Sequence, residues 1–205
     1  MLGIPNYEPN FCDNPEIFIK VFGDKLLSTI GLTLDDYWLM WETTDNKWYN
    51  DGPVILKIAD RQFEFTAYKL DKFSLTIDLI DLNEKLDWYG LGNDLPLIWK
   101  NKANSDLDKL VGRKIKDINV VAYNFISTIV EDKVKPENTG EITETGFMLH
   151  GIEFEFEKKG WLDNNNFLQI FNALDANGVT TEELKKDKQF QKININKGTT
   201  WQRNK

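Results

Sequence analysis

Apolar and polar residues alternate with a period of two over much of the chain, the pattern of β-strands with one face buried. Alternation falls in residues 37–42, 54–59, 62–68 and 74–79 and is strict in residues 152–157, and further strand candidates lie in residues 115–125 and 167–174. Short polar connections separate the first four stretches, including the turn signal Asn50–Pro53, so they predict an antiparallel meander. In residues 37–42 both alternating rows are largely apolar, and we expect both faces of that strand to be covered.

One motif occurs twice along the chain. Residues 63–83 and residues 154–177 each contain Phe-Glu-Phe, a polar spacer and an exit of the form Asp/Asn-x-Ile/Leu-Asp-x-Asn. The repetition favours two related β halves, residues 31–100 and 110–180. The alternative is that both copies are ordinary β-hairpins, since alternation with a few Asp or Asn positions arises easily in any hairpin.

Helical patterns occur near both ends of the chain. Asn14 is suited to an N-cap before Pro15, and apolar residues then recur at spacings of three and four up to Leu27, which predicts an N-terminal helix. Thr180-x-x-Glu183 is a capping-box pattern and predicts a short C-terminal helix. We therefore expect an α+β fold, mainly antiparallel sheet, as a single domain over residues 1–205 with a polar tail over residues 191–205.

Composition restricts the compartment and the cofactors. With 205 residues the chain can bury a core without disulfides or structural metals, and its single cysteine, Cys12, cannot form an internal disulfide. One cysteine and one histidine, His150, do not supply a zinc site, and no phosphate-binding glycine motif is present. No Lys or Arg precedes Lys20, and the longest apolar run is too short to cross a bilayer. We expect a cytoplasmic protein without a cofactor, a metal or membrane contact.

The charge is acidic and unevenly distributed. The net charge is −8, but residues 185–205 contain seven basic residues and one acidic residue, so the remaining chain carries −14. This balance argues against nucleic-acid binding, which needs Lys and Arg to meet phosphates. An acidic body would attract a basic protein partner, or would simply keep the protein in solution. Abundant Lys and Asn, with three Arg residues, would suit an AT-rich bacterial genome.

Three glutamates form one row of candidate binding residues. Glu153, Glu155 and Glu157 alternate with apolar residues, and Glu64 has a similar place in the first motif copy. Paired carboxylates at such distances can hydrolyse glycosides, but i and i+2 positions on any strand have this separation. We therefore interpret the row as a solvated strand face or an acidic docking surface. No catalytic set accompanies it.

The aromatic residues and the histidine supply the other candidates. Seven tryptophans are present, of which Trp38 and Trp41 fit a core, whereas Trp88 and Tyr89 lie in a Gly-rich crossover and fit an interface. His150 can be a general base or a structural residue, and no nucleophile motif accompanies it. Asp175 lies in a sequence that resembles a calcium loop, but aligning Gly178 with the loop's sixth position places Ala173 first and Leu184 twelfth, so calcium binding is rejected.

Two functional hypotheses follow. The leading one is a non-enzymatic acidic binding module that neutralises a basic partner, as bacterial immunity proteins do. The alternative is an enzyme or small-ligand-binding protein with a cleft between the two β halves, using His150, Glu153 and Asp175. The alternative requires His150 within hydrogen-bond reach of a carboxylate in a cleft, whereas a binding module needs an exposed acidic or aromatic patch. The sequence leaves the oligomeric state open.

Overall fold

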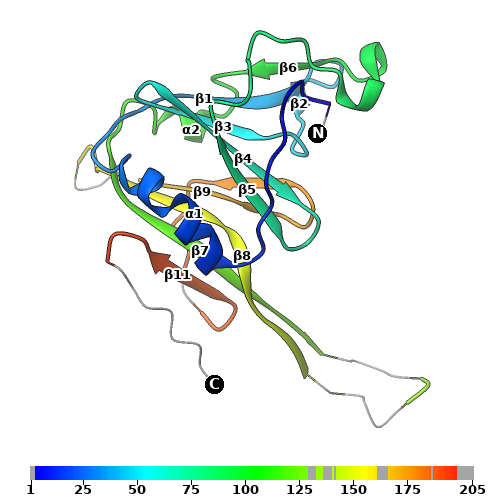
Figure 1. Ribbon diagram of the computed structural model, residues 1–205, viewed down its shortest axis with the longest axis vertical. Helices are drawn as coiled ribbons and strands as arrows, with labels where there is room; N and C mark the ends of the chain where they lie inside the picture. Colours follow the sequence, from blue (N-terminus) through cyan, green and yellow to red (C-terminus); the bar gives the residue numbers. More distant parts are fainter. Residues whose placement is uncertain are drawn as a thin grey trace.

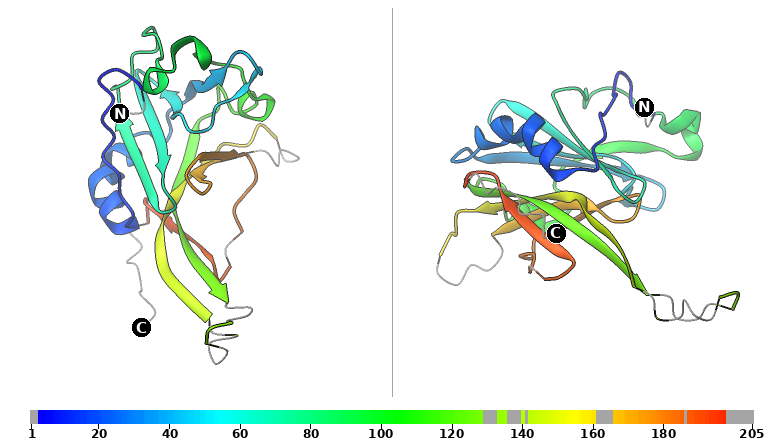
Figure 2. Two further views of the ribbon diagram at one scale, coloured as in Figure 1. Left: turned by 90° about the vertical axis from the view of Figure 1, so that its right-hand side faces the viewer. Right: turned by 60° about the horizontal axis from the view of Figure 1, so that its bottom comes forward.

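Two antiparallel sheets lie face to face, with helix α1 beside them (Figure 1; Figure 2, right). The computed structural model describes residues 3–128, 133–135, 140, 142–160, 166–185 and 187–197. The first sheet has the strand order β2 (Lys47–Trp48), β1 (Leu34–Glu42), β3 (Val54–Ile58), β4 (Arg61–Tyr68) and β5 (Lys72–Ile77), and β6 (Leu97–Lys100) also pairs with β1. The second sheet has the order β10 (Asn177–Thr180), β9 (Phe167–Asn172), β8 (Ile142–Phe156), β7 (Ile115–Thr128) and β11 (Phe190–Asn194).

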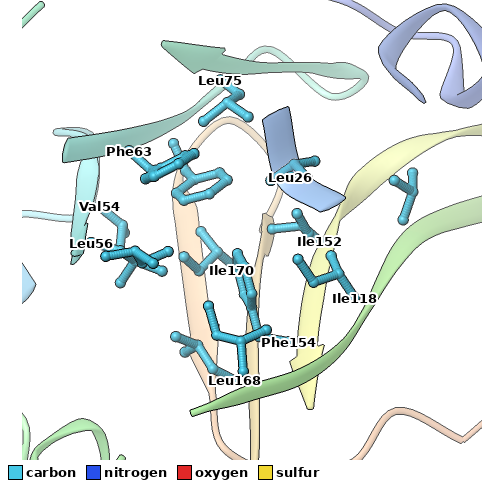
Figure 3. Close-up of a cluster of buried hydrophobic side chains, with 14 of the residues drawn as sticks. Leu26, Val54, Leu56, Phe63, Leu75, Ile118, Ile152, Phe154, Leu168 and Ile170 are labelled. Atoms are coloured by element: carbon cyan, nitrogen blue, oxygen red, sulfur yellow. The ribbon is translucent and has the colours of Figure 1, made fainter. Parts of the chain in front are cut away.

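The main core fills the space between the two sheets (Figure 3). In β4 the alternation turns Phe63 and Phe65 toward this core, and in β8 it does the same for Phe154 and Phe156. The rings of Phe65 and Phe154 meet edge to face with centroids 6.0 Å apart, which joins the sheets directly. The period-two pattern therefore identified the inward faces of both Phe-Glu-Phe strands.

A second apolar cluster covers the outer face of the first sheet. Met40 of β1 and Ile55 of β3 pack there against Ile4 and Tyr7 of the N-terminal arm, and against Trp88 of the crossover between β5 and β6. This cluster explains the two apolar rows of residues 37–42 and confirms that β1 is covered on both faces. Among the strand's aromatic residues, Trp38 is partly buried against this cluster.

Two helices are short and capped by asparagine. Helix α1 (Pro15–Leu27) begins as expected, with Asn14 Oδ1 accepting from the backbone N–H groups of Glu16 and Ile17 at 2.8 and 3.1 Å. Helix α2 (Ser105–Asp108) is capped in the same way by Asn104. Two 3₁₀ turns, η1 (Trp88–Gly90) and η2 (Gly92–Asp94), lie in the crossover. Across the described part of the chain, no helix has the length and apolar character to span a membrane.

The expected C-terminal helix is wrong. The segment that follows Thr180 forms a loop and then β11, which pairs with residues 119–123 of β7. Thr180 Oγ1 does accept from the N–H of Glu182, as a cap would, but side chains of the sheet satisfy the next backbone groups. The carbonyl of Glu182 accepts from Gln169 Nε2 at 2.7 Å, and the N–H of Leu184 donates to Glu153 at 3.0 Å. The backbone groups of Glu182 and Leu184 therefore bond to side chains of the sheet and not to one another in a helix. The polar tail predicted from residue 191 begins inside β11.

The two copies of the repeated motif become one hairpin in each sheet. The first copy forms β4–β5 and the second forms the end of β8 with β9. Their exits differ: Asp78 accepts from the N–H of Gln62 within its own hairpin at 2.7 Å, whereas Asn177 crosses to the other sheet. There Asn177 Oδ1 accepts from the N–H of Ala67, and its Nδ2 donates to the carbonyl of Gly52. Two β halves fit this architecture, and the second exit ties them together.

Candidate functional site

The predicted glutamate row is not a uniform solvated face. Glu153 is completely buried, because β11 and the loop before it cover this part of β8. Its carboxylate accepts from Lys192 Nζ at 2.8 Å, from the N–H of Leu184 at 3.0 Å and from Asn119 Nδ2 at 3.1 Å. Lys192 is itself only 8% exposed, so this is a buried ion pair on the outside of the sheet. The interpretation of Glu153 as a solvated residue is corrected accordingly.

The other two glutamates of the row differ from Glu153. Glu155 is partly exposed and pairs with Lys116 at 2.6 Å, and Glu157 is exposed at the end of the strand. A polar hollow of about 630 Å³ surrounds the buried pair, and Asp117 and Asn194 also line it. Asn194 Nδ2 donates to Asp117 at 2.7 Å, so amides and lysines hold the carboxylates Asp117, Glu153 and Glu155. This arrangement is a satisfied polar network that fixes β11 onto β7 and β8.

The alternative cleft residues are not brought together as a site. His150 packs among aromatic rings, and within the described residues no hydrogen bond joins it to a carboxylate. Burial lowers the pKa of His150 to about 4, so the ring is neutral at pH 7. Asp175 instead accepts from the N–H of Lys69 at the β4–β5 turn. Among the residues that the structure describes, no group of His, Cys, Asp or Glu is arranged to hold a metal ion.

The crossover residues Trp88 and Tyr89 have opposite exposures. Trp88 is 6% exposed and packs edge to face on Tyr49, with ring centroids 5.2 Å apart. Tyr89 is 65% exposed, and its ring meets that of Trp88 at 5.4 Å. Tyr89 has a φ of 50° and Gly90 a φ of 77°, so a left-handed turn presents the tyrosine. The expectation of two displayed aromatics is thus wrong for Trp88, which serves as the buried support of Tyr89.

Carboxylates surround this tyrosine in sequence. Residues 78–94, which we name the acidic crossover, contain five acidic residues and one lysine. Apart from Asp78, which pairs with Arg61, none of its carboxylates forms an ion pair within the described part of the chain. Asp87 has a local role, because it accepts from the N–H of Gly92 at 2.9 Å. Figure 1 shows this segment between β5 and β6, at the end of the molecule opposite the long β7–β8 hairpin.

Other tryptophans contribute less to a surface. Trp41 was expected in the core, but it is partly exposed at the end of β1, where Lys100 Nζ lies 3.8 Å from its ring centroid. Its Nε1 donates to Asn46 Oδ1 at 2.9 Å. Trp161 and Trp201 lie outside the described residues.

Sequence reasoning missed an apolar hollow on the outer face of the second sheet. Its volume is about 400 Å³. We name it the aromatic groove and define it by the residues Leu70, Tyr123, Phe125, Met148, His150, Phe171, Asn172, Ala173, Leu174, Gln189 and Phe190. The signal was present in the sequence, since Tyr123 and Phe125 occupy alternate positions of one strand, as do Met148 and His150. The pattern alone could not show that these outward rows meet.

Comparisons with family models, with curated proteins and with solved structures found no match.

Proposed function

We propose that the protein is a non-enzymatic binding module that captures a basic protein partner through the acidic crossover. Its role would be of the immunity type, in which capture neutralises the partner. The observation that carries this proposal is an exposed tyrosine on a fixed turn, accompanied by four carboxylates (Asp81, Glu84, Asp87 and Asp94) that form no ion pair with a lysine or arginine of the described chain. The predicted cytoplasmic, bacterial setting belongs to the same proposal.

The charges and the tyrosine would contribute differently to capture. Asp81, Glu84 and Asp94 are exposed, and exposed charges mainly steer a partner of opposite sign and speed association. Salt screens this effect beyond about 8 Å at physiological ionic strength. An aromatic anchor at the centre of a contact supplies affinity instead, and truncating such an anchor costs about 2 kcal/mol or more. Tyr89 is suited to that part because its buried neighbour Trp88 fixes the turn.

A pull-down from the native host tests the proposal with tagged wild-type protein and two variants. Tyr89→Ala removes the anchor, and the double variant Glu84→Gln/Asp94→Asn removes two exposed charges without touching a hydrogen bond of the described structure. The matched control is Asp24→Asn/Asp35→Asn, which removes two exposed charges elsewhere. We expect wild type and control to recover one basic protein at low salt and to lose it at high salt.

The two variants should then separate anchoring from steering. Tyr89→Ala is expected to weaken the affinity for the recovered partner by about 30-fold or more. The double-charge variant should lower the association rate and reduce its salt dependence, with little change in dissociation. Equal recovery by all proteins, or recovery of a partner that is not basic, would contradict the proposal.

A further inference from the structure

The floor of the aromatic groove is built by local exceptions to regular strand geometry. The β7–β8 register shifts between Val121 and Ala122, where His150 is the extra residue of a β-bulge. The His150 ring then stacks on Phe171 with centroids 5.1 Å apart and an interplanar angle of 27°. Phe171 has glycine partners on both sides, Gly151 and Gly178. A Cβ at Gly178 would overlap the Phe171 ring, so this glycine lets the ring lie flat against the sheet.

More rings extend this floor. Tyr123 and Phe190 lie 4.8 Å apart, and each is within 5.5 Å of the His150 ring. The floor therefore contains one side chain from each of the strands β7, β8, β9 and β11, and the pairing of these strands in one sheet fixes their positions. Such a surface is largely preformed, as small-molecule sites usually are.

The rim consists of two leucines that the fold holds in the open. Leu70 on the β4–β5 turn is 69% exposed and Leu174 on the β9–β10 turn is 68% exposed. Leu174 has a φ of 61°, a left-handed conformation that costs a side-chain-bearing residue about 1–2 kcal/mol. Strained backbone with exposed apolar side chains persists only where the surroundings impose it, and it is concentrated at ligand sites.

Hydrogen bonds between the two turns impose this arrangement. Asp175 accepts from the N–H of Lys69, and Asn172 Nδ2 donates to the carbonyls of Lys69 and Lys72 at 2.8 and 3.0 Å. The turn of the first sheet is thereby fixed against the turn of the second. These bonds fix the backbone positions from which Leu70 and Leu174 extend.

The lining selects the charge of an occupant. None of the described residues that line the groove is Lys, Arg, Asp or Glu, and His150 is neutral at pH 7. An adjoining hollow shares His150, Phe171 and Phe190 with the groove, and Glu182, Glu183 and Lys185 line that hollow but not the groove. A charged ligand lying between Leu70 and Leu174 would therefore lose its hydration without a counter-charge from the groove itself, which costs several kcal/mol. An uncharged ligand loses little, and it still finds the amide of Gln189 and the ring nitrogens of His150 as hydrogen-bonding groups. The volume of about 400 Å³ lies within the usual range for small-molecule pockets.

We infer that the aromatic groove binds an uncharged, mainly aromatic small molecule against the floor formed by Phe171, His150 and Phe190. Flat rings fit this floor because aromatic pairs stack or meet edge to face, and Leu70 and Leu174 would flank the bound molecule. This inference does not depend on the basic partner, since the groove and the acidic crossover share no residue.

The experiment uses N-phenyl-1-naphthylamine, an uncharged fluorescent naphthalene, with the full-length protein. We expect a saturable rise in its emission, and a shift of the Met148 methyl signal in NMR spectra that places the probe in the groove. Leu70→Asp puts a charge on the exposed rim without disturbing the core and should weaken binding at least about tenfold. Ile17→Asp is the matched control, because Ile17 is 54% exposed on α1, and it should bind the probe as wild type does.

Other outcomes would overturn the inference. They are the absence of saturable binding to wild type, equal weakening by both aspartate variants, and a Met148 signal that does not move. If the probe fails to bind but Leu70→Asp abolishes recovery of the protein partner, the groove is a protein contact and not a small-molecule site. Thermal unfolding of both variants would establish that each is folded.

Discussion

The buried pair of Glu153 and Lys192 gives the most direct test of how the second sheet is assembled. Replacing Lys192 with Met keeps much of the apolar stem but leaves a completely buried carboxylate without its cation. Removing one partner of a buried ion pair typically costs about 3–5 kcal/mol. The bonds from Leu184 and Asn119 remain in the variant, so we expect the lower end of that range, about 3 kcal/mol. Urea unfolding at 25 °C, followed by tryptophan fluorescence, measures the change in the free energy of unfolding.

Lys116→Met is the matched control for this experiment. Lys116 of β7 pairs with Glu155, which lies on the same strand as Glu153. Because Lys116 is 59% exposed, its loss should change stability by less than about 1 kcal/mol. The double variant Glu153→Gln/Lys192→Met should be destabilised by clearly less than the sum of its two single variants. If Lys192→Met and Lys116→Met have the same small effect, Glu153 is solvated in solution and β11 does not cover it.

Two further predictions concern the aromatic groove. The pKa of His150 is lowered by burial from 6.5 to about 4, so its contribution to stability is complete above pH 6.5 and is lost as the pH falls toward 4. The loss should reach about 3 kcal/mol near pH 4. Urea unfolding between pH 7.5 and pH 4 should therefore show the free energy of unfolding falling more steeply in the wild type than in His150→Gln. Parallel curves for the two proteins would contradict this prediction. Gly178→Ala should destabilise the protein by about 1–3 kcal/mol, because the new methyl group displaces the Phe171 ring. Gly160→Ala has open space around it and serves as the control in thermal unfolding, and equal melting temperatures for the two variants would refute the packing argument.

The sequence predicted the inward faces of the strands well, because alternation is a local property. Alternation places Phe63 with Phe65, and Phe154 with Phe156, on one face of their strands, and that face lies in the core. The Asn14 cap was also predictable, since its side chain bonds to the N–H groups two and three residues later. These features depend on neighbours in the chain and on nothing more distant.

The outward faces could not be assigned in the same way. Whether Glu153 is solvated depends on Lys192 and Leu184, which reach it only because β11 pairs with β7. Trp88 and Tyr89 are adjacent and similar in chemistry, yet Trp88 is buried in the cluster that contains Ile4 and Tyr7 of the N-terminal arm, whereas Tyr89 is exposed. The aromatic groove needs residues from four strands and two turns. Each of these outcomes is decided by contacts between distant segments, which periodicity does not record.

Glu64 and Glu153 are both completely buried, and each accepts hydrogen bonds from backbone N–H groups of a neighbouring segment. Through Glu64, this links the first sheet to the proposed binding surface. Glu64 accepts from Thr76 Oγ1 and from the N–H groups of Leu79 and Ile80, so it holds the chain where β5 ends. Glu153 does the same for the loop at Leu184. Because the acidic crossover begins at Asp78, Glu64 fixes its first residues as Trp88 fixes its middle. Glu64 therefore supports the start of the acidic crossover from the sheet, whereas Glu153 positions the loop that covers its own carboxylate.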